Sequence, residues 1–322
     1  MDVGDVEGDV NRRQLLSSLL ITPAVAAVVA SCGDDRIESG VGSSPTDPPG
    51  PDAPTTIGPP TSAPPATAAP AGPIDRPTGA DDVVLALRNG VGGFVMEGVA
   101  FTNVPQLLIT GDGRAFSAAP QIAIFPGPLL PPIAVRTITP EGVDKILQLA
   151  AEAGLVATPP DYSSEIMVTD VGSTELLIEA GGGRFLHVAE ALGFNVGPDG
   201  QPAEETSPAR QDLAAFVALL GDLPSLVGAE ALGEETILEA DTFRLQARPV
   251  NLADYEGQEI PPEIVDWPAD AGVRLADATD CATTDDPAIA ALFRDATQLT
   301  LFVEDGQHHS IAAVAQLPGD AC

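Results

Sequence analysis

The chain has 322 residues, of which 44% are hydrophobic and 4% aromatic, and its length allows one large domain or two of ordinary size. Its 47 acidic residues outnumber its 14 basic residues and give a formal net charge of -33. This diffuse negative field argues against a nucleic-acid partner, since phosphate binding needs clustered lysine and arginine. It favours solubility and mutual repulsion over a cation-binding role.

The N-terminal segment combines the three parts of an export signal. Arg12 and Arg13 resemble the twin-arginine motif, and the apolar stretch that follows, Leu15 to Val29, is shorter than the roughly 20 residues that span a bilayer. Val29-Ala30-Ser31-Cys32 then resembles a lipobox. We therefore expect residues 1–31 to be a signal peptide and Cys32 to be the lipidated residue. The alternatives are an ordinary cleaved signal and a cytoplasmic protein with an apolar N-terminal helix.

A proline-rich segment follows the lipidated cysteine. From Gly33 to Gly79, 12 of 47 residues are proline, and alanine, threonine, serine, glycine and aspartate supply most of the rest. Such a composition cannot bury enough apolar area to offset its ordering entropy. Residues 32–79 are therefore predicted to be a lipidated, disordered tether that holds the folded part at the extracytoplasmic face of the membrane. The alternative, a proline-rich docking motif, is disfavoured because the segment has no aromatic residue.

Residues 80–222 carry the pattern of an antiparallel sheet with helices. Two hairpins are predicted, one turning at Gly111-Asp112-Gly113 and one at Gly181-Gly182-Gly183. Two amphipathic helices are predicted after the capping pairs Thr139-Pro140 and Ser207-Pro208. The strand segments are 83–88, 106–110, 114–117, 175–180 and 184–190, with edge or irregular segments at 121–125 and 133–137. The pattern predicts an α+β unit in which two helices cover one face of an antiparallel sheet.

Residues 223–322 predict a smaller C-terminal α+β subdomain packed on the first unit. Strand-like segments at 236–239 and 242–247 precede an irregular, proline-containing stretch. A short helix is predicted to begin at Asp286-Pro287. A final hairpin pairs 297–304 with 307–317 around the turn Asp305-Gly306.

Cys281 and Cys322 are the cysteines that remain once Cys32 carries lipid. In an exported protein two thiols pair more often than they stay free, and closing a loop of this size stabilises by roughly 4 kcal/mol in the chain-entropy model. We therefore expect a disulfide that holds the C-terminus. The alternatives are two buried thiols and a metal site, and the second is disfavoured because no nearby Cys or His completes it.

His187, His308 and His309 are the chain's only histidines and the first candidates for chemistry. Neighbouring strand residues point to opposite faces, so we expect one of His308 and His309 to pack and the other to face solvent. His187 lies in a predicted strand, where an outward polar position is favoured over a catalytic one. The sequence has no G-x-S-x-G elbow, H-E-x-x-H pair or P-loop, and it predicts no catalytic, cofactor-binding or metal-binding residue.

Three further features have a structural interpretation that outweighs a functional one. Asp112, between two glycines, is expected in a hairpin turn. Trp267, the only tryptophan, is expected to pack in the core rather than to form a ligand platform. Four aspartates near Cys281 lack the spacing and central glycine of a calcium loop and are expected to form a solvated loop with a helix cap. They are Asp277, Asp280, Asp285 and Asp286.

Several short segments between Ala80 and Cys322 resemble a family of uncharacterised exported lipoproteins of high-GC actinobacteria. The segments are Gly92-Gly93-Phe94-Val95, Val104-Pro105, Gly111-Asp112-Gly113-Arg114, Gly127-Pro128-Leu129-Leu130-Pro131, Ala191-Leu192-Gly193, Asp266-Trp267-Pro268 and Leu317-Pro318, with Cys281 and Cys322. The resemblance implies a secreted lipoprotein with a terminal disulfide. It implies no activity, because many of the shared residues are glycines, prolines and turn positions.

Three functional hypotheses follow. The first is a non-catalytic, tethered protein that binds an envelope component or another protein, as the anchor and tether suggest. The second is an extracytoplasmic hydrolase, which needs two carboxylates in one cleft, one with a raised pKa. The third is a solute-binding subunit of a transporter, which would need two α/β lobes with parallel sheets.

Overall fold

The structure is a computed structural model that describes residues 73–93, 95, 98–163, 170–194, 205 and 207–322. All described residues belong to one compact unit. Arg12, Arg13, Cys32 and most of the predicted tether lie outside the described residues. The export and lipidation hypotheses therefore stay predictions.

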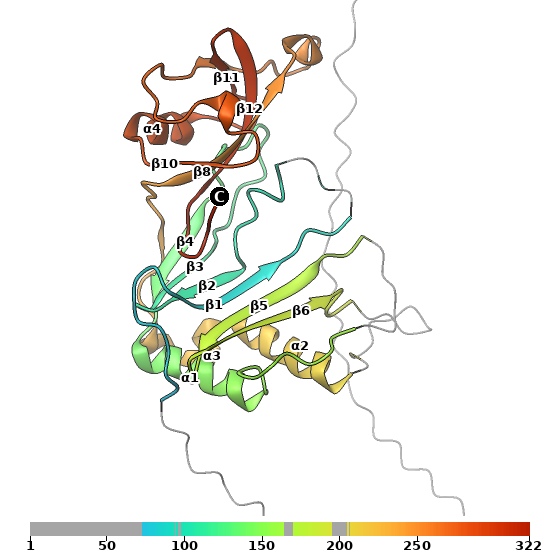
Figure 1. Ribbon diagram of the computed structural model, residues 1–322, viewed down its shortest axis with the longest axis vertical. Helices are drawn as coiled ribbons and strands as arrows, with labels where there is room; N and C mark the ends of the chain where they lie inside the picture. Colours follow the sequence, from blue (N-terminus) through green and yellow to red (C-terminus); the bar gives the residue numbers. More distant parts are fainter. Residues whose placement is uncertain (1–72, 94, 96–97, 164–169, 195–204, 206) are drawn as a thin grey trace, which may run out of the picture. The chain divides into compact units, whose positions relative to one another are not determined.

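The first sheet has seven strands, all paired antiparallel. They are β1 (Val83–Asn89), β2 (Leu107–Thr110), β3 (Arg114–Ala118), β4 (Ile133–Thr137), β5 (Ser173–Ala180), β6 (Gly183–Glu190) and β7 (Thr236–Ile237). Their order is β6-β5-β1-β2-β3-β4-β7 (Figure 1). The two predicted hairpins, β2 with β3 and β5 with β6, are both present.

Alternate residues of the first sheet face two different cores. Leu85 and Leu87 of β1 pack in the first core, whereas Ala86 between them packs in the second. Residues of β2 divide in the same way, with Ile109 in the first core and Leu108 in the second. Helices α1 (Pro140–Glu152), α2 (Pro208–Leu220) and α3 (Leu223–Val227) cover the first core (Figure 1).

The two long helices begin at the predicted caps. The Thr139 hydroxyl accepts a hydrogen bond from the Gly142 amide at 3.2 Å, and the Ser207 hydroxyl accepts one from the Arg210 amide at 3.3 Å. A proline at the first helical position follows each cap, because proline has no N–H that would go unpaired there. These local signals explain why both helices lie where the sequence predicts them.

The second sheet has five strands in the order β10-β8-β12-β11-β9 (Figure 1). The parallel pair is β9 with β11, and the other neighbours are antiparallel. The strands are β8 (Phe243–Val250), β9 (Ile264–Asp266), β10 (Ala282–Thr284), β11 (Leu301–Glu304) and β12 (Gln307–Ala315), and the helix is α4 (Pro287–Asp295). Short 3-10 helices are η1 (Ala229–Ala231), η2 (Leu252–Tyr255) and η3 (Leu275–Asp277). The second core contains Phe243, Phe293 and Phe302 from this part and Phe116 from the first sheet, so both sheets share it.

The α+β prediction is confirmed, but the predicted boundary between residues 222 and 223 is wrong. Helix α3 places Leu226 and Val227 in the first core, and β7 pairs with β4 at the edge of the first sheet. The first unit therefore continues to Ile237. The boundary was misplaced because both elements are short and are held by residues distant in sequence.

The end of the predicted tether is also wrong. Ile74 packs against the first core, and the Arg76 guanidinium pairs with the Asp144 carboxylate at 3.2 Å and donates to the Gly111 carbonyl at 3.0 Å. Residues 73–79 therefore belong to the folded part, although their composition resembles that of the tether. Within the described part of the chain, no helix is both long and apolar enough to cross a membrane.

Candidate functional site

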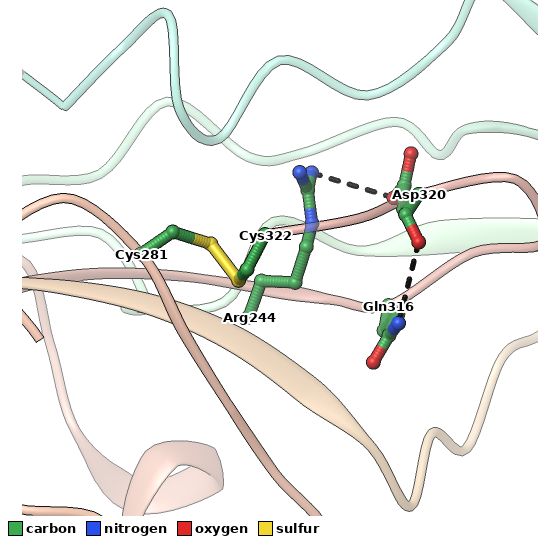
Figure 2. The surroundings of a disulfide bond; sticks show 5 residues. All are labelled: Arg244, Cys281, Gln316, Asp320 and Cys322. Carbon is green, nitrogen blue, oxygen red and sulfur yellow. Dashed lines mark hydrogen bonds and ion pairs between the residues drawn. A yellow bond between two sulfur atoms is a disulfide. The ribbon is translucent and has the colours of Figure 1, made fainter.

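The C-terminal segment is held against both sheets. Cys281 and Cys322 form the predicted disulfide, with their Cα atoms 5.2 Å apart (Figure 2). Near it, the buried Asp320 carboxylate accepts a hydrogen bond from Arg88 of β1 at 2.8 Å, and it pairs with Arg244 of β8 at 3.3 Å. We call this arrangement of Cys281, Cys322, Asp320, Arg88 and Arg244 the C-terminal clasp.

The clasp is a structural feature rather than a reactive one. The Leu317 amide donates to the Asp320 carboxylate at 3.2 Å, and the Gln316 side-chain amide donates to the Asp320 carbonyl at 3.4 Å (Figure 2). The Arg244 guanidinium also lies over the Phe101 ring, 5.4 Å from its centroid. Asp320 therefore pairs with both arginines, and the disulfide closes the arrangement.

One candidate binding site is an apolar groove of about 610 Å³ beside β4 and α4. Pro128, Leu130, Pro131 and Pro132 from the loop before β4 line it, together with Ile237 of β7. Two buried rings, Phe243 and Phe293, and two charged residues, Glu239 and Arg294, also belong to the lining. We call this site the proline groove. Its apolar walls and few polar groups are typical of ligand pockets.

The aromatic rings behind the proline groove give it a rigid floor. The Phe293 ring contacts the rings of Phe243 and Trp267, with centroid distances of 5.9 and 6.1 Å. Trp267 is buried, and its indole N–H donates to the Val273 carbonyl at 2.9 Å, so its predicted core position is confirmed. The sequence predicted the packing of Trp267 but not the groove, because the groove forms where segments distant in sequence meet.

Comparisons with protein-family models, curated proteins and solved structures find no match for this chain. The resemblance to exported actinobacterial lipoproteins therefore stays a prediction. What the proline groove can bind follows from its own residues.

A second, more polar hollow of about 430 Å³ lies over β1, β5 and β6, on the face of the first sheet opposite the first core. Arg88, Arg184, Glu175 and Glu179 line it, as do Asp81 and Asp82. Among the described residues, no group of three or more His, Cys, Asp or Glu side chains is placed to hold a metal ion. The hollow offers charges of both signs and no arrangement that favours a particular reaction.

His187 is completely buried, so the predicted outward position is wrong. Its Nε2 lies 2.8 Å from the Leu155 carbonyl oxygen and its Nδ1 lies 2.7 Å from the Tyr162 hydroxyl. A carbonyl only accepts, so Nε2 carries the hydrogen, and Nδ1 accepts from the hydroxyl. Burial lowers the pKa of His187, and the hydrogen bond to Leu155 offsets part of that effect. A neutral imidazole with both nitrogens satisfied serves packing rather than catalysis.

Arg210 is another buried polar residue of this region that the sequence did not indicate. Its guanidinium is fully buried and pairs with Glu205 at 2.6 Å. It also donates to the carbonyls of Tyr162, Glu190 and Ala191, at 2.9, 3.1 and 3.3 Å. Because these partners satisfy its donors, Arg210 joins α2 to the end of β6 and leaves no group aimed at a ligand.

The remaining candidates behave largely as the sequence predicts. His309 packs and His308 is half-buried. Asp112 lies in the turn between β2 and β3; burial raises its pKa, but hydrogen bonds from Thr110 and Arg114 outweigh burial and lower it. Asp286 caps α4, with its carboxylate accepting from the Ala288 amide at 2.8 Å.

Proposed function

We propose that this chain is an exported protein, anchored by lipid at Cys32 to the extracytoplasmic face of the membrane, whose folded part binds an apolar ligand without catalysis. The observation that carries the binding proposal is the proline groove, in which buried aromatic rings lie behind an apolar wall. The anchor and its export signal at Arg12 and Arg13 are supported by the sequence pattern.

The groove favours a hydrocarbon chain with a small anionic end. Hydrocarbon removes the apolar lining from water at about 25 cal/mol per Å² buried. Arg294 lies at the groove and is held by a hydrogen bond to the Ala240 carbonyl at 3.3 Å, so its charge can meet a carboxylate or phosphate. Because the whole chain carries -33, contact with hydrocarbon rather than long-range attraction must supply the affinity. An acyl group of an envelope component has this chemistry.

The other hypotheses have less in their favour. The hydrolase needs a carboxyl group with a raised pKa. The pKa of Asp112 is raised by burial but lowered overall by hydrogen bonds from Thr110 and Arg114, and hydrogen bonds from neighbouring residues lower the pKa of Asp161 and of Asp222. The transporter subunit needs lobes with parallel sheets, whereas in both sheets described here the pairing is antiparallel except for β9 with β11.

Trp267 allows a direct test of the groove, since it is the only tryptophan and contacts Phe293. The full chain carrying Cys32→Ser is titrated with dodecanoate, and a saturable change in tryptophan fluorescence is expected. Ile237→Asp should weaken binding about tenfold, because it adds a negative charge to the lining. Leu219→Asp, at an exposed position of α2, is the matched control and should change nothing. Absence of saturable binding to the parent protein contradicts the groove proposal and leaves the anchor untouched.

Arg294→Gln separates the charge from the apolar contact. It should weaken binding of dodecanoate and leave binding of dodecanol, the neutral analogue of the same length, unchanged. Equal weakening of both ligands would show that Arg294 acts through packing.

The anchor is tested separately by cell fractionation. Cys32→Ala should move the protein from the membrane fraction to the medium or leave it unprocessed. Replacement of Arg12 and Arg13 by Lys should block export if the twin-arginine route is used. Membrane fractionation that Cys32→Ala does not alter would contradict the lipid anchor.

A further inference from the structure

Among the described strands, β6 lies at one edge of the first sheet (Figure 1). Its hairpin with β5 closes with Ala180 opposite Gly183, across Gly181 and Gly182, both of which have positive φ. In such a two-residue hairpin the closing pair is hydrogen-bonded, and hydrogen-bonded and open pairs alternate from there. The N–H and C=O groups of the odd-numbered residues of β6 therefore point to β5, and those of the even-numbered residues point to that edge.

Within the described part of the chain, few of the outward backbone groups of β6 have a partner. Within the described residues, no backbone hydrogen bond other than those of the β5–β6 ladder involves Arg184, Leu186 or Val188. At the end of the strand, the Glu190 carbonyl accepts from Arg210 at 3.1 Å, and a carbonyl can accept a second hydrogen bond. An edge of this length is a template for another strand.

The four even-numbered residues of β6 also have exposed side chains, which lie on the face of the sheet opposite the first core. They are Arg184, Leu186, Val188 and Glu190. Leu186 is 51% exposed and Val188 is 44% exposed. His187, which lies between them, and Ala189, which follows Val188, are both buried. Arg184, which pairs with Glu179 of β5 at 3.5 Å, and Glu190 lie at the two ends and are exposed as well. The strand thus presents the pattern positive, apolar, apolar, negative along one face.

This pattern is complementary to itself. If two copies pair antiparallel about a two-fold axis at His187, Leu186 of one copy lies opposite Val188 of the other. The same register places Arg184 opposite Glu190, once on each side of the axis. The even-numbered residues of one strand then meet those of the second, so their outward N–H and C=O groups can form the ladder. Apolar and opposite-charge cross-strand pairs both stabilise such a ladder.

We propose that this chain forms a two-fold dimer in which β6 pairs antiparallel with β6 of a second copy, in the register that places Arg184 opposite Glu190. The pairing is isologous: each copy contributes its β6 edge, and both of these edges are then paired. The assembly therefore closes as a dimer instead of growing into a fibre. A second copy fits this edge because the two-fold axis reverses the direction of its β6. The positive end of one strand then lies opposite the negative end of the other. The charge of -33 on each copy opposes association, so salt that screens it should favour the dimer.

Charge reversal tests both the interface and its register. The full chain carrying Cys32→Ser is studied by sedimentation velocity over a concentration series, and a monomer–dimer equilibrium is expected. Arg184→Glu alone, or Glu190→Arg alone, places like charges opposite each other and should raise the dimer Kd about tenfold. The double variant restores opposite charges and should restore the Kd. Val188→Lys should also weaken the dimer, whereas Ile264→Lys, at an exposed position of β9, an edge strand of the second sheet, should not.

A cross-link provides a second readout that does not depend on affinity. Leu186→Cys and Val188→Cys variants, mixed and oxidised, should give a disulfide-linked dimer of one chain of each kind, because hydrogen-bonded pairs have Cα atoms about 5.5 Å apart. Each variant alone should cross-link far less. Purely monomeric protein, a dimer that both single reversals leave unchanged, or a double variant that stays weak would each overturn the proposal. Circular dichroism confirms that every variant is folded.

Discussion

The buried imidazole of His187 makes the folded state sensitive to mild acid. Burial lowers the pKa of His187 below the value of about 6.5 that it has in the unfolded chain. Below that pH the unfolded state therefore binds more protons than the folded state, and the free energy of unfolding decreases as the pH falls. At higher pH the imidazole is neutral in both states, so this contribution is constant.

We expect urea denaturation to show a decrease in the free energy of unfolding from about pH 7 to about pH 5. The His187→Gln variant should show a smaller decrease. The variant should retain part of the decrease, because burial also lowers the pKa of His309. Tyr162→Phe is the control: it removes the hydroxyl that donates to His187 but keeps the imidazole, so the pH dependence should remain. An equal decrease in the parent protein and in His187→Gln would show that this residue does not cause it.

The position of His187 could not be predicted from its neighbours. Leu186 and Val188 are apolar, so the alternation of side chains along a strand predicts that they face the core and that His187 faces solvent. The structure shows the opposite: they are 51% and 44% exposed, and His187 is buried. The groups that allow its burial, the Tyr162 hydroxyl and the Leu155 carbonyl, lie 25 and 32 residues away in sequence. A strand pattern does not contain that information.

Helix α4 depends on its capping residue, and this dependence can be measured. The Asp286 carboxylate accepts from the Ala288 amide at 2.8 Å, and Pro287 occupies the first helical position. Asp286→Ala leaves that amide unpaired and should lower the free energy of unfolding by about 1 kcal/mol in urea. The adjacent Asp285 is exposed, so Asp285→Ala is a matched control that removes the same charge and should have little effect. Equal losses in the two variants would show that charge, rather than capping, determines the effect.

The elements that the sequence predicted well are those with local signals. The caps at Thr139, Ser207 and Asp286 mark α1, α2 and α4, and the two glycine turns mark the hairpins. The elements that it missed, α3, β9 and β10, have no more than five residues each. The pairing partners of β9 and β10 are distant in sequence, and α3 packs on α1 as well as on its neighbour α2. Elements this short acquire their conformation from such contacts.

At the scale of the whole molecule, the C-terminal clasp joins parts that the sequence suggested were separate. Asp320 binds Arg88 of the first sheet and Arg244 of the second, and Leu108 and Phe116 of the first sheet lie in the second core. The sequence predicted the disulfide from the cysteine count. It could not predict that the residues around Cys322 would connect both sheets, because the contact between Asp320 and Arg88 spans 232 residues.

The clasp therefore predicts that reduction weakens the whole folded unit. The disulfide joins residues separated by 41 positions, and its loss should lower the free energy of unfolding by about 4 kcal/mol in the chain-entropy model. The double variant Cys281→Ser with Cys322→Ser should match the reduced parent protein in urea denaturation. Asp320→Asn keeps the disulfide and removes the carboxylate, so it isolates the ion pairs and should cost about 1–3 kcal/mol. If reduction costs no more than Asp320→Asn, the ion pairs alone hold the C-terminus and the disulfide adds little. The expected order, with the disulfide variant weaker than Asp320→Asn, follows because freeing Cys322 also frees Asp320 from both arginines.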